Sequence, residues 1–249
     1  MSNLINSKVE RDRIREEKQR QILLFLLAEG FSIAAVLALL LNMTPNGMQR
    51  ILRRMEKAGL IKAHTVDFEL SAWNLKIWGL TPTGALLATD MDEDMKFFEV
   101  GRVKPITIAH SLALQRVKVI ALRYGWNQWE SSSRMLKKAN KSRSEWIQVP
   151  DAVARSPKGR KVAIELERTA KTPKRYVEIL ANYAEMISMG VIDEVIYVCP
   201  EKQTAPLERL FHRIEKIIFK GKTIPTPAGL LERFYFSSIE DWEQKAANF

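Results

Sequence analysis

The sequence predicts a two-domain protein of the mixed α+β or α/β class, with a helical first domain that ends in a β-hairpin and an α/β second domain. Three observations predict this class. Three helical stretches precede two short strands within the first 90 residues, an acidic stretch then changes the composition abruptly, and helices and strands alternate from residue 105 onward. We therefore expect domains at residues 1–90 and 105–249, joined by an acidic connector at 91–104.

The composition favours a folded protein with a polyanionic partner. A hydrophobic share of 46% over 249 residues is enough for packed cores. Lys and Arg number 39 against 29 Asp and Glu, which gives a formal charge of +10 and favours nucleic acid or an anionic membrane face. The single cysteine, Cys199, excludes an internal disulfide framework and a multi-cysteine zinc site, so we expect a reducing, cytoplasmic location.

A nearly uniform apolar run from Ile22 to Leu41 is as long as a bilayer span, which raises the alternative of a membrane-attached protein. Two residues near the centre of the run count against it. Glu29 would place a charge in the bilayer, and Gly30 beside it is typical of a helix end. We therefore expect two buried helices and no stable membrane insertion.

The first domain begins with three predicted helices. The first covers about Arg11 to Ala28, and the second covers Phe31 to Leu41. The third begins at Thr44 and Pro45, an N-cap followed by proline at the first helical position, and ends before Gly59. Its apolar residues recur at helical spacing and predict a buried stripe: Met48, Ile51, Leu52 and Met55.

Two strands follow the third helix. LIKAHTV and LKIWGLTP read as strands around the polar segment DFELSAWN, and Thr81-Pro82 then opens a helix that runs through Ala88. Three helices and a β-hairpin are the pattern of a winged helix-turn-helix, whose third helix enters the major groove of DNA. The alternative is an ordinary solvated basic face. The residues that we expect to contact DNA are Asn46, Gln49, Arg50, Arg53 and Arg54.

The second domain alternates helices with strands. The predicted elements are a helix from Ile106 to Tyr124, a strand in WNQWESSS, a hairpin formed by IQVPDAVA and KVAIELER, a helix from Thr172-Pro173 through Met189, a strand in VIDEVIYVCP and a helix from Leu207 to Phe219. The apolar spacing of the helix after Thr172 predicts that Tyr176, Leu180, Tyr183 and Ile187 are buried.

The hairpin turn in SPKG sets the register of its two strands. Pro157 suits the second position of a type I turn, and Gly159 suits the left-handed position that follows. The resulting three-residue loop pairs Ser156 with Arg160.

This register places Asp151 directly opposite Glu165, and Glu167 shares their face because side chains two apart on a strand point to the same side. Like charges that face each other across strands destabilise a sheet, and a divalent cation would relieve the repulsion. We therefore expect a magnesium or manganese site at these three acids. The alternative is that they form the solvent face of an amphipathic hairpin, balanced by neighbouring lysines.

The helix that follows the hairpin starts with basic residues. Lys174 and Arg175 lie in its first turn, where the helix macrodipole favours acids instead. Lys171 comes just before the helix. Unfavourable charges on both elements indicate a site in which Lys171, Lys174 and Arg175 contact a scissile phosphate or its neighbours while the carboxylates hold a metal ion.

The motifs of this domain resemble two related groups of proteins. Pro150-Asp151, a hairpin and the run Glu165-Leu166-Glu167 are similar to the PD-(D/E)xK motif of the restriction-endonuclease fold, except that Glu167 stands where that motif has lysine. The fuller pattern of a winged helix, PDAV, IELERT and a helix with NYAEM resembles the replication-relaxation family and, within it, the MobC-type plasmid mobilisation relaxases.

The resemblance implies a metal-dependent, site- and strand-specific DNA nickase that starts plasmid mobilisation or conjugative transfer at the origin of transfer. Its partners would be double-stranded plasmid DNA at that origin, then single-stranded DNA, and other mobilisation and coupling proteins. The alternative is a plasmid replication or transcription regulator that binds DNA with a degenerate, non-cleaving nuclease domain, which the missing motif lysine favours.

The resemblance also implies roles for individual residues. Asp151, Glu165 and Glu167 carry over as the acidic catalytic and metal-binding set, with Lys171 or Lys174 in place of the missing lysine. His110 matches a histidine of the family's second domain and is a possible site-lining residue, as is Glu130 on the strand before the hairpin. Tyr176 raises the alternative of a covalent tyrosine mechanism, although its spacing favours core packing.

Overall fold

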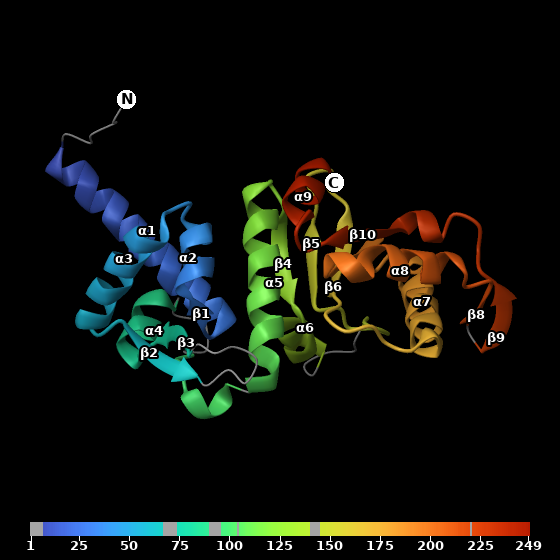
Figure 1. Ribbon diagram of the computed structural model, residues 1–249, viewed down its shortest axis with the longest axis horizontal. Helices are drawn as coiled ribbons and strands as arrows, with labels where there is room; N and C mark the ends of the chain where they lie inside the picture. Colours follow the sequence, from blue (N-terminus) through green and yellow to red (C-terminus); the bar gives the residue numbers. More distant parts are fainter. Residues whose placement is uncertain (1–6, 67–73, 90–95, 104, 140–144, 220) are drawn as a thin grey trace. The chain divides into compact units, whose positions relative to one another are not determined.

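The computed structural model describes residues 7–66, 74–89, 96–103, 105–139, 145–219 and 221–249. The chain divides into two compact units, Met1–Val119 and Ile120–Phe249, and each unit contains both helices and strands (Figure 1). The mixed α+β class is confirmed. The predicted domain bounds stay a prediction, because residues 90–95 and 104 of the acidic connector region lie outside the described residues. The division between the units falls within helix α5 (Pro105–Arg123).

The first unit packs helices around a small antiparallel sheet with strand order β1-β3-β2. Its elements are α1 (Lys8–Glu29), β1 (Ser32–Ile33), α2 (Ala34–Leu40), α3 (Pro45–Lys57), β2 (Ile61–Val66), β3 (Leu75–Leu80), α4 (Pro82–Ala88), the 3-10 helix η1 (Val100–Arg102) and most of α5. Residues 67–73, most of the segment DFELSAWN that we expected between the two hairpin strands, lie outside the described residues.

The apolar run from residue 22 to 41 forms the end of α1, strand β1 and helix α2, and not one span, so the second helix starts later than the expected Phe31. Helix α1 ends at Glu29, and Gly30 caps it as expected, with a positive φ of 81° that glycine adopts readily. Ile22 and Leu26 of α1 and Leu37 of α2 are buried in the core of the unit. Among the described residues, no helix combines the length and the apolar character that crossing a membrane requires.

Helix α3 has the predicted start and the predicted buried stripe. The Thr44 hydroxyl accepts a hydrogen bond from the Gly47 N–H at 3.2 Å and so caps the helix. Met48, Leu52 and Met55 are buried, and Ile51 is partly buried. The opposite face is open to solvent, with Asn46, Arg50, Arg53 and Arg54 exposed and Gln49 half-buried.

The second unit contains a five-stranded sheet with strand order β10-β7-β6-β5-β4. Strands β10, β7 and β6 are parallel, while β5 is antiparallel to both β6 and β4. The elements are β4 (Asn127–Ser131), α6 (Ser132–Ala139), β5 (Ala152–Arg155), β6 (Lys161–Leu166), α7 (Pro173–Ser188), β7 (Glu194–Cys199), α8 (Glu201–His212), β8 (Lys216–Phe219), β9 (Lys222–Pro225), the 3-10 helix η2 (Leu231–Arg233), β10 (Phe234–Ser238) and α9 (Trp242–Asn248).

The hairpin of β5 and β6 has the predicted turn and register. The Gly159 N–H donates to the Ser156 carbonyl at 2.9 Å, and Gly159 has a φ of 79°. The Ser156 N–H in turn donates to the Arg160 carbonyl at 2.9 Å. The local turn chemistry therefore fixes which residues of the two strands face each other.

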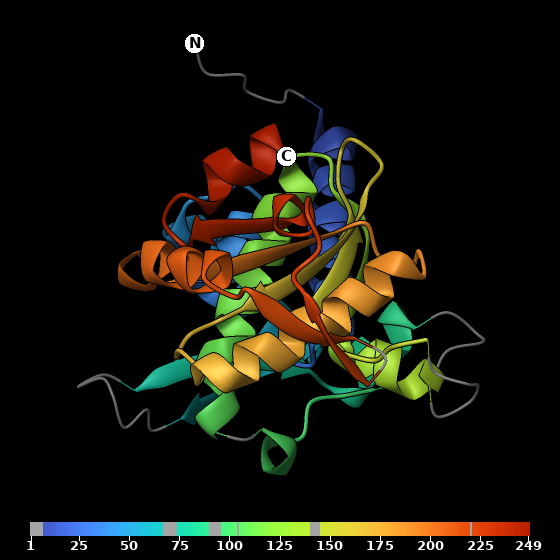
Figure 2. The same ribbon diagram turned by 90° about the vertical axis from the view of Figure 1, so that its right-hand side faces the viewer.

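The expected helix from Leu207 to Phe219 was wrong. The helix in this region, α8, starts at Glu201 directly after Pro200 and ends at His212. Lys216–Phe219 is strand β8, which pairs with β9 in a separate two-stranded ribbon that packs beside α7 (Figure 2). The β-branched pair Ile217-Ile218 favours a strand there.

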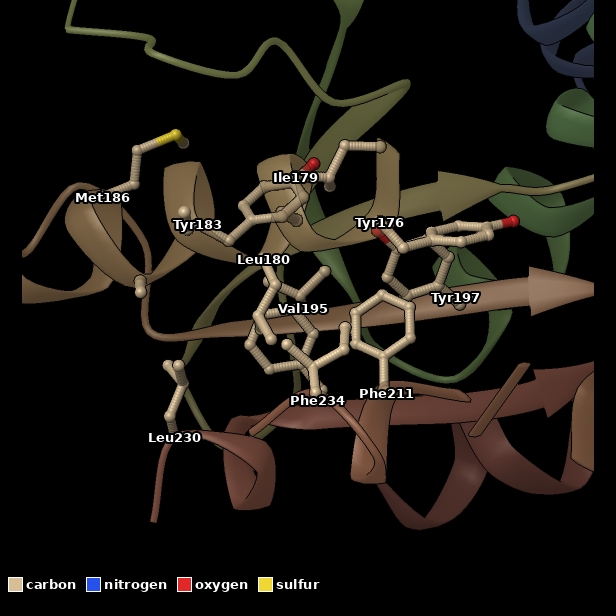
Figure 3. Close-up of a cluster of buried hydrophobic side chains, with 14 of the residues drawn as sticks. Tyr176, Ile179, Leu180, Tyr183, Met186, Val195, Tyr197, Phe211, Leu230 and Phe234 are labelled. Atoms are coloured by element: carbon tan, nitrogen blue, oxygen red, sulfur yellow. The ribbon is translucent and has the colours of Figure 1, made fainter. Parts of the chain in front are cut away.

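One face of the sheet carries an aromatic core (Figure 3). Tyr176, Leu180 and Tyr183 are fully buried on α7, as predicted from their spacing, while Ile187 is only partly buried. They pack with residues from β7, α8 and β10, namely Val195, Tyr197, Phe211 and Phe234. This core fixes how α7 lies against the sheet, and it therefore positions the side chains where α7 meets β6.

Candidate functional site

Asp151 and Glu165 face each other at the end of the β5–β6 hairpin. Ala152 pairs with Ile164, so the next pair outward along the ladder is Asp151 with Glu165, and partners in an antiparallel ladder share a face of the sheet. The Leu166 N–H donates to the Asp151 Oδ2 atom at 2.8 Å. This bond anchors Asp151 to β6 beside Glu165, as the predicted register requires.

Glu165 is a carboxyl group in an unfavourable setting for a negative charge. Burial raises its pKa to about 7, and the charge of Asp151 adds to the rise. A hydrogen bond from the Tyr183 hydroxyl and the positive charge of Lys171 act in the opposite direction. A charged Glu165 is therefore costly near neutral pH unless a cation is bound next to it.

Glu167 lies on the same strand but has a partner of its own. Only 6% of Glu167 is exposed, and its carboxylate Oε2 accepts a hydrogen bond from the Lys171 ammonium group. The Glu167 N–H donates to the Val198 carbonyl at 2.9 Å and so continues the pairing of β6 with β7. The acid at the motif's lysine position is thus paired with a lysine four residues later.

Tyr176 is held in its protonated form near Glu167. Its hydroxyl accepts a hydrogen bond from the Lys171 N–H at 3.0 Å, and the ring is fully buried. Burial raises the pKa of Tyr176 to about 12, and the Glu167 charge adds to the rise. These features fit core packing better than an ionised nucleophile.

Tyr197 places a buried hydroxyl group beside the acids. It pairs with Glu165 across the β6–β7 ladder and is 1% exposed. Burial raises the pKa of Tyr197 well above its ordinary value, and the charges of Glu165 and Glu167 contribute. Within the described part of the chain, this hydroxyl has no hydrogen-bond partner. A buried polar atom without a partner indicates a place for water or a ligand.

The carboxylates offer two adjacent ligands to a cation. In the described ranges, no group of three or more His, Cys, Asp or Glu side chains is placed to hold a metal ion. Magnesium needs fewer protein ligands than that, since it commonly binds through one or two carboxylates and keeps several waters. Asp151 and Glu165 supply these two carboxylates. The raised pKa of Glu165 means that a bound cation would stabilise its charged form, and the unpartnered Tyr197 hydroxyl could bond to a water of the ion. Glu167 is engaged with Lys171.

The other predicted site residues are distributed over both units. Lys174 and Arg175 are exposed in the first turn of α7, and Arg175 forms an ion pair with Glu178 at 3.0 Å. Glu130 pairs with Val153, which puts it on the sheet face of Asp151 and Glu165. His110 lies on α5, in the part of that helix that belongs to the first unit. The polar residues of α3 belong to the first unit as well. Their functional roles stay predictions.

Sequence reasoning missed Tyr183 and Tyr197 as polar members of the site. Tyr183 was expected to be buried from its helical spacing, and both tyrosines are buried. Strand alternation in VIDEVIYVCP predicts that the Tyr197 side chain shares a face of the strand with Val195 and Cys199. The strand pairing that brings this face next to Glu165 is not visible in the sequence. No sequence signal pairs Tyr183 with Glu165, since that contact depends on how α7 packs across β6.

Comparison with known proteins gives one family match. A model of the replication-relaxation family matches residues 24–196, which extend from α1 into β7. No curated protein matches the chain. A solved structure of a Lactococcus lactis ZitR mutant in its apo form is 26% identical, with a TM-score of 0.25, over 32% of this chain. The match spans 58% of that protein's chain.

Proposed function

This chain belongs to the replication-relaxation family, and on that premise we propose that it is a metal-dependent, site- and strand-specific DNA nickase of the MobC type. It would act at a plasmid's origin of transfer to start mobilisation or conjugation. The observation that carries the proposal is the pairing of Asp151 with a Glu165 whose pKa is raised to about 7. Perturbed carboxyl groups of this kind are typical of catalytic sites.

The second unit supplies the proposed cleavage site, in an arrangement that we interpret as restriction-endonuclease-like. Asp151 and Glu165 would hold a magnesium or manganese ion. When bound, such an ion supplies positive charge to the phosphate and lowers the pKa of a bound water. The charge of Lys171 acts on the Glu165 carboxyl, and Lys171 would substitute for the motif's lysine by moving from Glu167 to the phosphate.

The first unit supplies the proposed DNA-recognition element. Helix α3, followed by the β2–β3 hairpin, supports the interpretation as a winged helix-turn-helix. The exposed Arg50, Arg53 and Arg54 would then contact phosphates or bases in the major groove. The proposed partners are the duplex at the origin of transfer, the single strand released there, and further mobilisation and coupling proteins.

The test is a plasmid relaxation assay with the full chain. Supercoiled cognate plasmid is incubated with and without magnesium or manganese, and we expect open circles only with metal. Asp151→Ala and Glu165→Ala should abolish nicking while DNA binding persists. Glu208→Gln is the matched control, because it removes an exposed acid of the same unit from α8. Binding lost in parallel with nicking would argue against separate recognition and cleavage sites.

A second candidate is a DNA-binding replication or transcription regulator. It is favoured by Glu167, which stands in the position of the motif's lysine and is neutralised by Lys171. A regulator would bind cognate DNA with full affinity and leave supercoiled plasmid intact at every metal concentration. The same assay therefore separates the two candidates.

A further inference from the structure

A basic groove lies on the sheet face that carries the two acids. It has a volume of about 390 Å³ and is formed by β4, β5, the start of β6 and α6. The side chains that matter for its chemistry are Gln128, Trp129, Arg134, Lys138, Arg155 and Lys161. Four of these six carry a positive charge, and the volume falls in the range of small-molecule binding sites.

The groove lies further along the same hairpin from the acids and begins at Val153. Arg155 pairs with Lys161 near the turn of the hairpin. Because side chains two apart on a strand share a face, Arg155 lies on the same face as Val153 and Asp151. At the rise of a β-strand, the four steps from Asp151 to Arg155 cover about 13 Å. A nucleic-acid strand a few nucleotides long can therefore reach from the acids to the cations.

An irregular segment of β4 shapes one wall of the groove. The pairing of β4 with β5 shifts register between Asn127 and Glu130, and Gln128 has a φ of 51°. This left-handed backbone is costly for a residue with a side chain and is most often kept at functional sites. Here it lets the Gln128 Oε1 atom accept a hydrogen bond at 3.0 Å from Arg155, which orients the guanidinium group.

The two lysines of the groove form ion pairs with carboxylates. Lys138 lies 2.7 Å from Glu130, and Lys161 lies 3.7 Å from Glu145. The two lysine side chains are 66% and 31% exposed, and ion pairs near the surface contribute at most about 1 kcal/mol, so a phosphate can compete with the carboxylates for the lysines. Of the described residues that line the groove, Glu130 alone carries a carboxylate.

We propose that this groove holds the backbone of single-stranded DNA next to the acids, with Trp129 stacking on one base. Cations beside an accessible aromatic ring are the combination that binds single strands without sequence preference. The inference rests on the proposed nicking function, because nicking at Asp151 and Glu165 would release such a strand at the end of the groove.

The test measures binding of the full chain to a fluorescein-labelled oligothymidine by fluorescence anisotropy at several salt concentrations. The groove variants are Arg134→Ala, Lys138→Ala and Trp129→Ala. Lys137→Ala is the matched control, since Lys137 is exposed on the same helix and does not line the groove. Trp129→Phe keeps an aromatic ring, so it separates the loss of stacking from a loss of folding. Circular dichroism checks that each variant is folded.

Removing a cation that contacts a phosphate should weaken binding and reduce the slope of log affinity against log salt by about 0.7. Trp129→Ala should weaken binding about five-fold or more, whereas Trp129→Phe should bind nearly as the parent protein does. Lys137→Ala should match the parent in affinity and slope. A duplex of the same length should be bound equally by parent and groove variants.

Three results would overturn the proposal: no binding of oligothymidine by the parent protein, equal affinities for all variants, or a loss for the duplex as large as the loss for the single strand. The last result would assign the groove to double-stranded DNA. Nicking is measured in parallel. If the parent protein does not nick plasmid but the groove variants still bind oligothymidine more weakly than the parent does, the proposed nicking function is wrong and the single-strand groove is supported.

Discussion

The Tyr183 hydroxyl donates a hydrogen bond to the Glu165 carboxylate and thus joins the centre of α7 to β6 at the acid pair. Tyr183 is fully buried, so the bond is shielded from water. This bond lowers the pKa of Glu165 and so opposes the effects of burial and Asp151. The tyrosine therefore tunes how readily Glu165 ionises near neutral pH.

Tyr183→Phe should raise the pKa of Glu165 further above about 7, because it removes an interaction that favours the charged form. If Glu165 binds a metal ion, protons will then compete more strongly. The metal concentration needed for half-maximal nicking should rise near pH 7 and recover at higher pH. Tyr235→Phe, on β10, is the control. An unchanged pH profile for Tyr183→Phe would show that Glu165 does not titrate during the reaction.

The pH dependence of stability offers a test without any assay of activity. The folded pKa of Glu165, about 7, lies above the ordinary value of 4.5, so the folded state binds more protons between these limits. Its contribution is fully favourable below about pH 4.5 and is lost as the pH rises through about 7. The free energy of unfolding should therefore fall across this window by up to about 3 kcal/mol.

Chemical denaturation of the parent protein and Glu165→Gln at a series of pH values measures this effect. The glutamine variant should lose that part of the pH dependence and be the more stable protein near pH 8. Magnesium or manganese should stabilise the parent near pH 8 and leave Glu165→Gln nearly unaffected, because binding to the folded state alone shifts the equilibrium. Parallel pH profiles for the two proteins would contradict the raised pKa.

The hairpin shows what the sequence could predict about this fold. The SPKG turn, the register that follows from it and the facing of Asp151 and Glu165 all depend on residues close together in the chain. Turn chemistry and strand alternation are local rules, and the structure follows them. The same holds for the threonine caps at Thr44 and Thr172, which start α3 and α7 where they were expected.

What the sequence did not predict depends on distant contacts. Strand β10 pairs in parallel with β7, with Phe234 beside Val195, and no local pattern specifies that partner. The apolar spacing of α8 continues past His212 into Lys216–Phe219, so the sequence pattern indicates helix where the structure has strand β8. The Tyr183 hydroxyl reaches Glu165 because α7 packs across β6, and Tyr197 lies beside Glu165 because β7 pairs with β6. Burial was predictable from spacing, whereas these polar contacts were not.

The exposed arginines of α3 provide a test of the proposed recognition helix. Arg50→Ala and Arg53→Ala should each weaken duplex binding and, if they contact phosphates, reduce the salt slope by about one counterion. An arginine that reads a base would instead relax sequence preference by about 1–3 kcal/mol at one position. Arg13→Ala is the control, since it removes an exposed arginine from α1. Unchanged affinity and slope for both variants would refute the winged-helix assignment.

The pairing of Glu167 with Lys171 permits a test of what replaces the motif's lysine. Glu167 is buried, whereas 40% of the Lys171 side chain is exposed, so solvent screening makes the pair worth about 1 kcal/mol. Lys171→Met should leave Glu167 buried without its counter-ion and lower stability, while Glu167→Gln should cost less. Thermal unfolding of both variants and of the double variant measures how strongly the two residues are coupled.

Nicking rates of the same three variants at saturating metal distinguish two roles for Lys171. If it only neutralises Glu167, the defect of Lys171→Met should largely disappear in the double variant, because the charge that needed neutralising is gone. If Lys171 faces the phosphate, the double variant should stay as slow as Lys171→Met alone. A Glu167→Gln variant that needs more metal but reaches the parent's rate would instead make Glu167 a ligand. Rates equal to that of the parent in all three variants would remove both residues from the reaction and leave Asp151 and Glu165 as its acids.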